Sequence, residues 1–329
     1  MKKSFLKIAI LFIIISMVIG SDAAFADFRI KPFNISLGVT ESLGYSSNPG
    51  YSNKKCYNNS FYNKMQADLG VELPFGKMHR YSWNSSSDWL YNFQHSEYTT
   101  LNNRFSQSVD LVFNKWTLNI HQNLTQGQDP TVRERTVITT NSLLKRLSNN
   151  VGFVVRGDLG KLKLATGFDY LGYSANKVYN TLDRDEFSYF LEGGVELTPR
   201  ITAFVRGAGE HTNRRSSNFN NNTGWSIVGG ARGDITPYLV GEVSAGGAWR
   251  DYKKGANNQD STDYAGLLCN VALTNRLSTN TTQRLSYSFS PEPGYDSNFY
   301  RSSLLQYGVN HRLNSRITLN ATVDWENVR

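Results

Sequence analysis

Five histidines are the side chains best suited to acid–base chemistry in this sequence. They are His79, His95, His121, His211 and His311. Histidine beside a serine or a carboxylate can support hydrolysis, so the candidate pairs are His95 with Ser96 and His211 with Glu210. The sequence shows no His, Cys and carboxylate spacing typical of a metal site. Lone histidines of this kind are more often solvated than catalytic, and we expect no enzyme, no metal and no cofactor.

A second chemical group consists of charged residues at alternating positions of short segments. They are Arg156, Asp158, Arg206, Glu210, Arg232, Asp234, Glu242, Arg250 and Arg284. On the inner face of a closed sheet they would line a hydrated pore that offers weak contacts to sugar hydroxyls and uronate carboxylates. The alternative is a set of cross-strand ion pairs that rigidifies or plugs the interior. For most single residues the ion-pair interpretation is favoured.

The residues predicted to line the pore are Arg156, Arg206, Glu210, Arg232, Glu242, Arg250 and Arg284. The tyrosines Tyr51, Tyr57, Tyr179 and Tyr295 fall in polar segments and could stack on sugar rings. Packing within loops explains these tyrosines at least as well. Cys56 and Cys269 have contexts too different for a disulfide framework, and Cys269 shares its face with apolar neighbours, so we expect it to meet lipid.

The first 26 residues have the features of a secretory signal. Lys2, Lys3 and Lys7 precede an apolar run from Ile8 to Gly20, and Ala24-Phe25-Ala26 forms a cleavage site. An uncleaved anchor is the alternative, although the run is shorter than the roughly 20 residues of a membrane-spanning helix. The remaining chain, 27–329, is expected to form one domain.

Composition restricts the fold class of that domain. Apolar residues make up 39% of the chain and aromatic residues 13%, with 18 Tyr and 18 Phe, so Leu-rich and Ala-rich helical cores are excluded. The formal net charge is +8, but the charges are scattered and mixed in sign. Without a basic run or a recognition helix, nucleic-acid binding has little support.

Apolar and polar residues alternate strictly along many segments. Clear examples are 65–73, 116–124, 187–197, 225–235 and 317–326. A period of two places the apolar set on one face of a β-strand and the polar set on the other. One such segment is weak evidence, but the repetition predicts a sheet that is wet on one face.

Short and long connections alternate between these segments. The short turns are expected near Gly76-Lys77, Asn114-Lys115, Leu159-Gly160, Thr198-Pro199, Thr236-Pro237, Asn275-Arg276 and Asn314-Ser315. The long stretches are Ser47–Ser60, Gln94–Asn102, Gly127–Asn141, Ser174–Asp185, Thr212–Thr223, Lys253–Ser261 and Ser290–Phe299. Outer-membrane barrels have this asymmetry. A secreted all-β module has no reason to keep it.

Aromatic residues near both sets of connections predict two interfacial girdles. Those beside short turns are Phe33, Phe113, Trp116 and Tyr238, and those beside long loops are Tyr45, Tyr98, Tyr173, Trp249, Tyr252 and Tyr264. We therefore expect an all-β, antiparallel transmembrane β-barrel with its N-terminus in the periplasm and its longer loops outside.

About 15 strands are visible, whereas bacterial single-chain barrels have an even number. The last segment runs outward and stops at Val328-Arg329, which predicts a chain that lacks its final strand or strands. The alternative is an uncounted short strand within Val132–Thr140.

Several short motifs, in order along nearly the whole exported chain, carry a family resemblance. They are Tyr45-Ser46-Ser47-Asn48, Gln128-Asp129-Pro130, Asp183-Arg184-Asp185-Glu186, Leu197-Thr198-Pro199-Arg200, Ile235-Thr236-Pro237 and the stretch from Tyr300 to Trp325-Glu326. The chain resembles the putative β-barrel porin family of Gram-negative exopolysaccharide gene clusters. That resemblance implies an intact barrel of about 16–18 strands.

The resemblance also implies an outer-membrane protein that contacts lipid and serves as a non-enzymatic conduit or scaffold for exported polysaccharide, together with other export or synthesis components. A general diffusion porin is the alternative function, and a secreted all-β sugar-binding module is less favoured. The family supplies no catalytic residues.

Overall fold

The computed structural model describes residues 24–46, 60–94, 96, 99–129, 144–215, 221–253, 262–293, 298–314 and 318–328. Its strands are β1 (Ala24–Ile30), β2 (Phe33–Ser46), β3 (Ser60–Phe75), β4 (His79–Asn92), β5 (Thr100–Val112), β6 (Trp116–Asp129), β7 (Leu144–Leu159), β8 (Leu162–Ala175), β9 (Arg184–Thr198), β10 (Ile201–Arg214), β11 (Asn222–Asp234), β12 (Leu239–Tyr252), β13 (Tyr264–Ser278), β14 (Thr281–Pro293), β15 (Phe299–Arg312) and β16 (Thr318–Val328). A short 3₁₀ helix, η2 (Lys177–Leu182), precedes β9.

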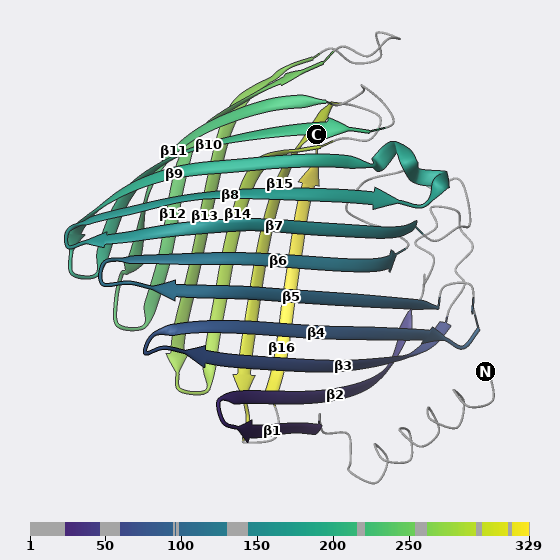
Figure 1. Ribbon diagram of the computed structural model, residues 1–329. Coiled ribbons are helices and arrows are strands. Elements are labelled where there is room, and N and C mark those ends of the chain that lie inside the picture. The colour runs from purple at the N-terminus through teal and green to yellow at the C-terminus, as the bar shows by residue number, and fades with distance from the viewer. Residues whose placement is uncertain are drawn as a thin grey trace.

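The described strands form one 16-stranded sheet in which sequence order and spatial order coincide, from β1 to β16. Every adjacent pair is antiparallel, as shown for example by β1 with β2 and β15 with β16. The sheet curls so that β12–β16 cross behind β2–β9 (Figure 1). The prediction of an antiparallel, all-β barrel is confirmed.

The strands from β2 to β16 account for the expected count of about 15, and β1 is the additional strand. This strand begins at Ala24, within the expected cleavage site, and pairs with β2 through Val39. Cleavage after Ala26 stays a prediction. So does the proposed absence of a further strand: within the described residues β16 pairs with β15, and no ladder joins it to β1. Val132–Thr140 lies outside the described residues.

Figure 1 shows the tight hairpins of β3–β4, β5–β6 and β7–β8 at the opposite end of the strands from the longer β8–η2–β9 connection. One predicted turn is wrong. β13 continues through Asn275-Arg276 to Ser278, and the turn lies at Thr279-Asn280. Side-chain hydrogen bonds from Ser278 to Thr281 and from Thr279 to Asn280, and one from the Asn280 backbone N–H to Ser278 Oγ, stabilise the reversal there. The sequence pattern did not indicate this turn.

The register gives the sheet one mainly apolar and one mainly polar face, because directly paired residues in antiparallel strands share a face. The apolar face is exposed: Leu191, Leu267 and Val323 are 67%, 72% and 68% accessible. The polar face lies inside the curl, since its side chains contact each other across intervening strands, as His121 on β6 does with Asp169 on β8. A water-soluble protein would not present such an apolar exterior.

Three of the girdle predictions are wrong. Tyr173, Tyr252 and Tyr264 are 6%, 7% and 2% accessible and belong to the inner face. Tyr173 packs against Leu182 of η2, and Tyr252 and Tyr264 pack with Ala248. Phe33, Phe113, Trp116, Tyr238, Tyr45 and Trp249 are exposed as expected. Tyr98 lies outside the described residues. The proximity of an aromatic residue to a loop therefore does not determine whether its side chain lies on the inner or the outer face of the sheet.

Helical structure contributes little to the described part of the chain, where no helix has the length and apolar character needed to cross a membrane.

Gly246 lies where the backbones of β11 and β12 approach closely. A Cβ at Gly246 would lie 2.0 Å from the Ile227 carbonyl oxygen and 2.6 Å from the Val228 Cα. We expect Gly246→Ala to lower the free energy of unfolding by about 2 kcal/mol, because strand backbones must move apart. Urea unfolding of the refolded protein, followed by gel mobility with and without boiling, measures this.

Gly193→Ala is the matched control, because a Cβ at this strand position meets nothing within 4 Å. An equal loss of stability in both variants would contradict the assigned role of Gly246.

Candidate functional site

The seven residues predicted to line a pore all lie on the inner face. Pairing places Arg206 opposite Glu192, Arg232 opposite Glu242, and Arg250 and Glu210 on either side of Gly224. Arg156 pairs with Ala165, which in turn pairs with Glu192, and Arg284 pairs with Thr274 of the same face. Their shared face follows from the period of two, whereas their role in a pore stays a prediction.

Glu192 on β9 is the centre of a charged cluster on the inner face. Its side chain is 4% accessible, and its carboxylate accepts hydrogen bonds from Arg206 Nε at 2.8 Å and Arg232 Nη2 at 2.5 Å. The Arg206 and Arg232 side chains are 40% and 36% accessible. A single nearly buried carboxylate therefore fixes two partly exposed cations on the inner wall.

Aromatic rings support both cations. The Arg206 guanidinium lies 5.0 Å from the centre of the Phe190 ring, and that of Arg232 lies 4.9 Å from the Phe204 ring. Each ring extends over a glycine of the neighbouring strand: a Cβ at Gly167 would be 2.5 Å from Phe190, and one at Gly230 would be 2.9 Å from Phe204. Cation–π contact and the ion pairs together hold the guanidinium planes.

A second ion pair bridges β10 and β12 across β11. Glu210 pairs with Arg250, whose Nη1 also donates to the Pro291 carbonyl oxygen on β14 at 3.3 Å. Gly224 of β11 lies between the partners, and a Cβ there would be 2.7 Å from Glu210 Oε1. This glycine gives the pair the space to form.

The remaining predicted residues make fewer contacts. Glu242 and Arg284 have no hydrogen bond or ion pair within the described residues, and Arg156 is near enough to Asp110 for an electrostatic interaction. Arg284 lines a cavity of about 330 Å³ with Asn310 and Asn320. These three residues therefore fit a solvated interior rather than a rigid ion-pair network.

Sequence reasoning missed a polar network on β4–β8. Arg80 donates to Asp110, which also accepts from Asn119, and His121 contacts Asn119 and Asp169 at 3.1 and 2.8 Å. Alternation could have assigned these residues to the inner face. Their pairing depends on register between strands that are distant in sequence.

The structure separates one of the two proposed catalytic pairs. His211 contacts Thr223 at 3.0 Å, while the adjacent Glu210 faces inward and pairs with Arg250. Consecutive residues of a strand point to opposite faces. His95 lies outside the described residues.

The remaining expectations concern metals, cysteines and loop tyrosines. The described residues hold no group of three or more His, Cys, Asp or Glu side chains placed to bind a metal ion. Cys269 is free and on the apolar face, and Cys56 is outside the described residues. Tyr51, Tyr57 and Tyr295 also lie outside them, and Tyr179 is described only as part of the η2 backbone.

One ion pair lies at the end of the strands near the longer connections. Arg215, just after β10, donates to both carboxylate oxygens of Asp185 at 2.9 and 2.6 Å. These hydrogen bonds raise the pKa of the Arg215 guanidinium above its ordinary value.

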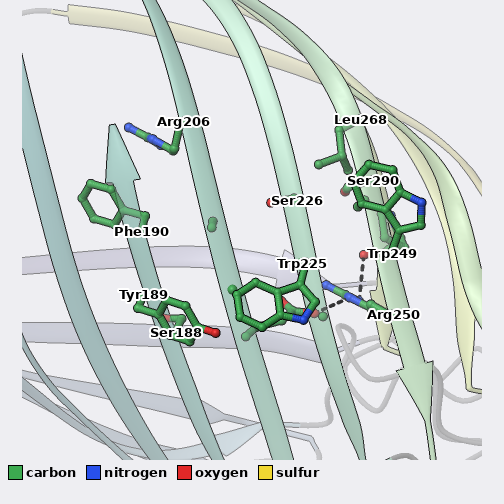
Figure 2. Close-up of a pocket in the computed structure, with 16 residues that line it drawn as sticks. Ser188, Tyr189, Phe190, Arg206, Trp225, Ser226, Trp249, Arg250, Leu268 and Ser290 are labelled. Atoms are coloured by element: carbon green, nitrogen blue, oxygen red, sulfur yellow. Dashed lines mark hydrogen bonds and ion pairs between the residues drawn. The ribbon is translucent and has the colours of Figure 1, made fainter. Parts of the chain in front are cut away.

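A cavity of about 340 Å³ lies beside the two charged clusters. Figure 2 shows Phe190 and Arg206 at one end and Arg250, Leu268 and Ser290 at the other. Its volume falls within the range of small-molecule sites, about 300–1,000 Å³. The inner wall therefore contains a recess with charged, hydroxyl and aromatic groups.

Comparison with known proteins identifies a family and a fold. The model of a family described as putative beta-barrel porin 2 matches residues 30–329. A comparison with curated proteins finds no match.

Among solved structures, the siderophore receptor PiuA from Acinetobacter baumannii is similar, with a TM-score of 0.52, 7% identity, and coverage of 93% of this chain and 63% of that one. A mutant of the ferric enterobactin receptor PfeA from Pseudomonas aeruginosa is similar with a TM-score of 0.50 and 9% identity, and the match covers 92% of this chain and 61% of that one. The copper transporter OprC is similar with a TM-score of 0.50 and 9% identity, and the match covers 93% of this chain and 60% of that one. The chain spans less than two thirds of each, and the similarity shows the fold alone.

Removing the central carboxylate should destabilise the inner wall. We expect Glu192→Gln to cost about 3 kcal/mol in the free energy of unfolding, because Arg206 and Arg232 would lose the charge between them. Urea unfolding monitored by tryptophan fluorescence measures this change. Glu242→Gln is the control: Glu242 pairs in register with Arg232 but forms no ion pair within the described residues. Similar losses in both variants would rule out a special role for Glu192.

Proposed function

The chain belongs to the putative beta-barrel porin 2 family, and from that membership we propose that it is a non-enzymatic outer-membrane conduit for an exported polysaccharide. The bacterium would be Gram-negative, with lipid around the apolar face. Other export or synthesis components would act with the barrel as its partners.

The observation that supports this function is the chemistry of the inner wall. Charged side chains alternate there with an amide and an imidazole, as in the chain of hydrogen bonds from Arg80 through Asp110, Asn119 and His121 to Asp169. A polymer rich in hydroxyl groups needs both donors and acceptors along its path. Many weak contacts allow passage, whereas one tight contact would prevent release.

The charge balance of the wall also suits a sugar polymer. Glu192 offsets one of its two arginines, and Glu210 offsets Arg250. A wall of this kind can contact neutral sugars through hydroxyl groups and acidic sugars through arginine. Permeation of either would require no chemical step.

A general diffusion porin is the second candidate function, because a hydrated wall would also admit small solutes. A secreted sugar-binding module is disfavoured by the exposed apolar face, where Leu267 is 72% accessible. The two membrane functions differ in their cargo, which is exported polysaccharide for the conduit and small solutes for the diffusion porin. This difference is measurable.

Deletion of the gene should reduce polysaccharide at the cell surface and raise the amount retained in the cell. Re-expression of the intact gene should restore export. The measurement is quantification of surface and periplasmic polysaccharide in the deletion strain, the complemented strain and the parent.

Unchanged export together with slower uptake of small solutes would contradict the polysaccharide function and favour the diffusion porin. Release of the protein into the periplasm, with no heat-modifiable band, would contradict both membrane functions.

A further inference from the structure

We propose that the cavity beside Arg206 and Arg250 is a saccharide-binding site through which the inner wall contacts its cargo. This inference rests on the proposed polysaccharide conduit and specifies where in the wall the polymer binds. Figure 2 shows the cavity's charged and aromatic residues.

The recess exists because small residues are paired side by side on consecutive strands. Ala208 pairs with Ser226, and Ser226 pairs with Ala248. Phe190 pairs with Ala208 and ends this row of small residues at β9. Longer side chains lie in the adjacent rows, with Arg206 on one side and Glu210 and Arg250 on the other. The cavity extends from β9 to β14, a span of about 24 Å at the usual spacing between strands. Its length suits a stretch of linked rings better than a single ion.

Charged groups on both long sides of the recess provide donors and acceptors. Arg206 lies on one side, oriented by Glu192, and the Glu210–Arg250 pair lies on the other. The Glu210 side chain is 38% accessible and that of Arg206 is 40% accessible, so both retain polar surface for a ligand. The presence of a carboxylate in the recess argues against a site for anions alone.

Hydroxyl and aromatic groups complete the lining. Ser226 and Ser290 contribute hydroxyls, and Phe190 forms the end wall. A sugar ring presents hydroxyls at its edge and C–H groups on its faces, so it can bond to the first set and pack on the second.

The test uses oligosaccharides prepared by partial hydrolysis of the surface polysaccharide from the bacterium that carries the gene. Isothermal titration calorimetry on the detergent-purified, refolded protein measures their binding. We expect Ala208→Phe to fill the recess and weaken binding by about tenfold or more.

Ser106→Phe is the matched control. It places the same ring on the inner face of β5, opposite Asn84 and Asn123, away from the recess. This variant should bind like the unchanged protein. Arg206→Gln is a second test that keeps the recess open, and we expect it to weaken binding with the heat-modifiable band retained.

The outcomes separate this inference from the proposed function. If deletion of the gene impairs export but the fragments fail to bind, or bind Ala208→Phe and Arg206→Gln as well as the unchanged protein, the cavity is not the binding site and the conduit stands. If deletion leaves export unchanged, the proposed function fails. Selective loss of binding in both cavity variants, with Ser106→Phe unaffected, supports the site.

Discussion

The need to pair every backbone N–H and C=O group inside hydrocarbon is the constraint on which this structure depends. A chain that crosses a bilayer without helices must satisfy these groups between strands. The uninterrupted antiparallel order from β1 to β16 does so for β2 to β15, each of which has a paired neighbour on both sides. Once the backbone is extended, successive side chains must take opposite faces. The apolar exterior and the polar interior are two results of the same backbone geometry.

The local consequences of that geometry could be predicted from the sequence. Alternation between Ile317 and Glu326 gives both the strand and its faces, because a period of two is visible without knowledge of the neighbours. The same rule placed Arg206, Arg232 and Arg250 together on one face before any pairing was known. It also indicated the correct face for Tyr252, which has the same parity as Arg250. The girdle prediction was wrong there because closeness to a loop was given more weight than parity.

Contacts between strands could not be predicted in the same way. The Glu192 cluster joins β9, β10 and β11, and the His121–Asp169 contact joins residues 48 positions apart. Such contacts depend on the register between strands, and the length of the turn in each hairpin sets that register. Glycines decide which of them can form, as Gly224 does beneath the Glu210–Arg250 pair. The recess has the same origin, since Ala208, Ser226 and Ala248 become adjacent only when three strands are aligned.

Site-directed spin labelling along β12 tests the assignment of the two faces most directly. Labels are attached to single cysteines in a background with Cys56→Ser and Cys269→Ser, in lipid vesicles. At positions 243, 245, 247 and 249 we expect relaxation by lipid-dissolved oxygen, and at positions 242, 244, 248 and 250 relaxation by a water-soluble nickel chelate. Uniform accessibility along the strand, or the opposite parity, would contradict a lipid-facing apolar surface around a hydrated interior.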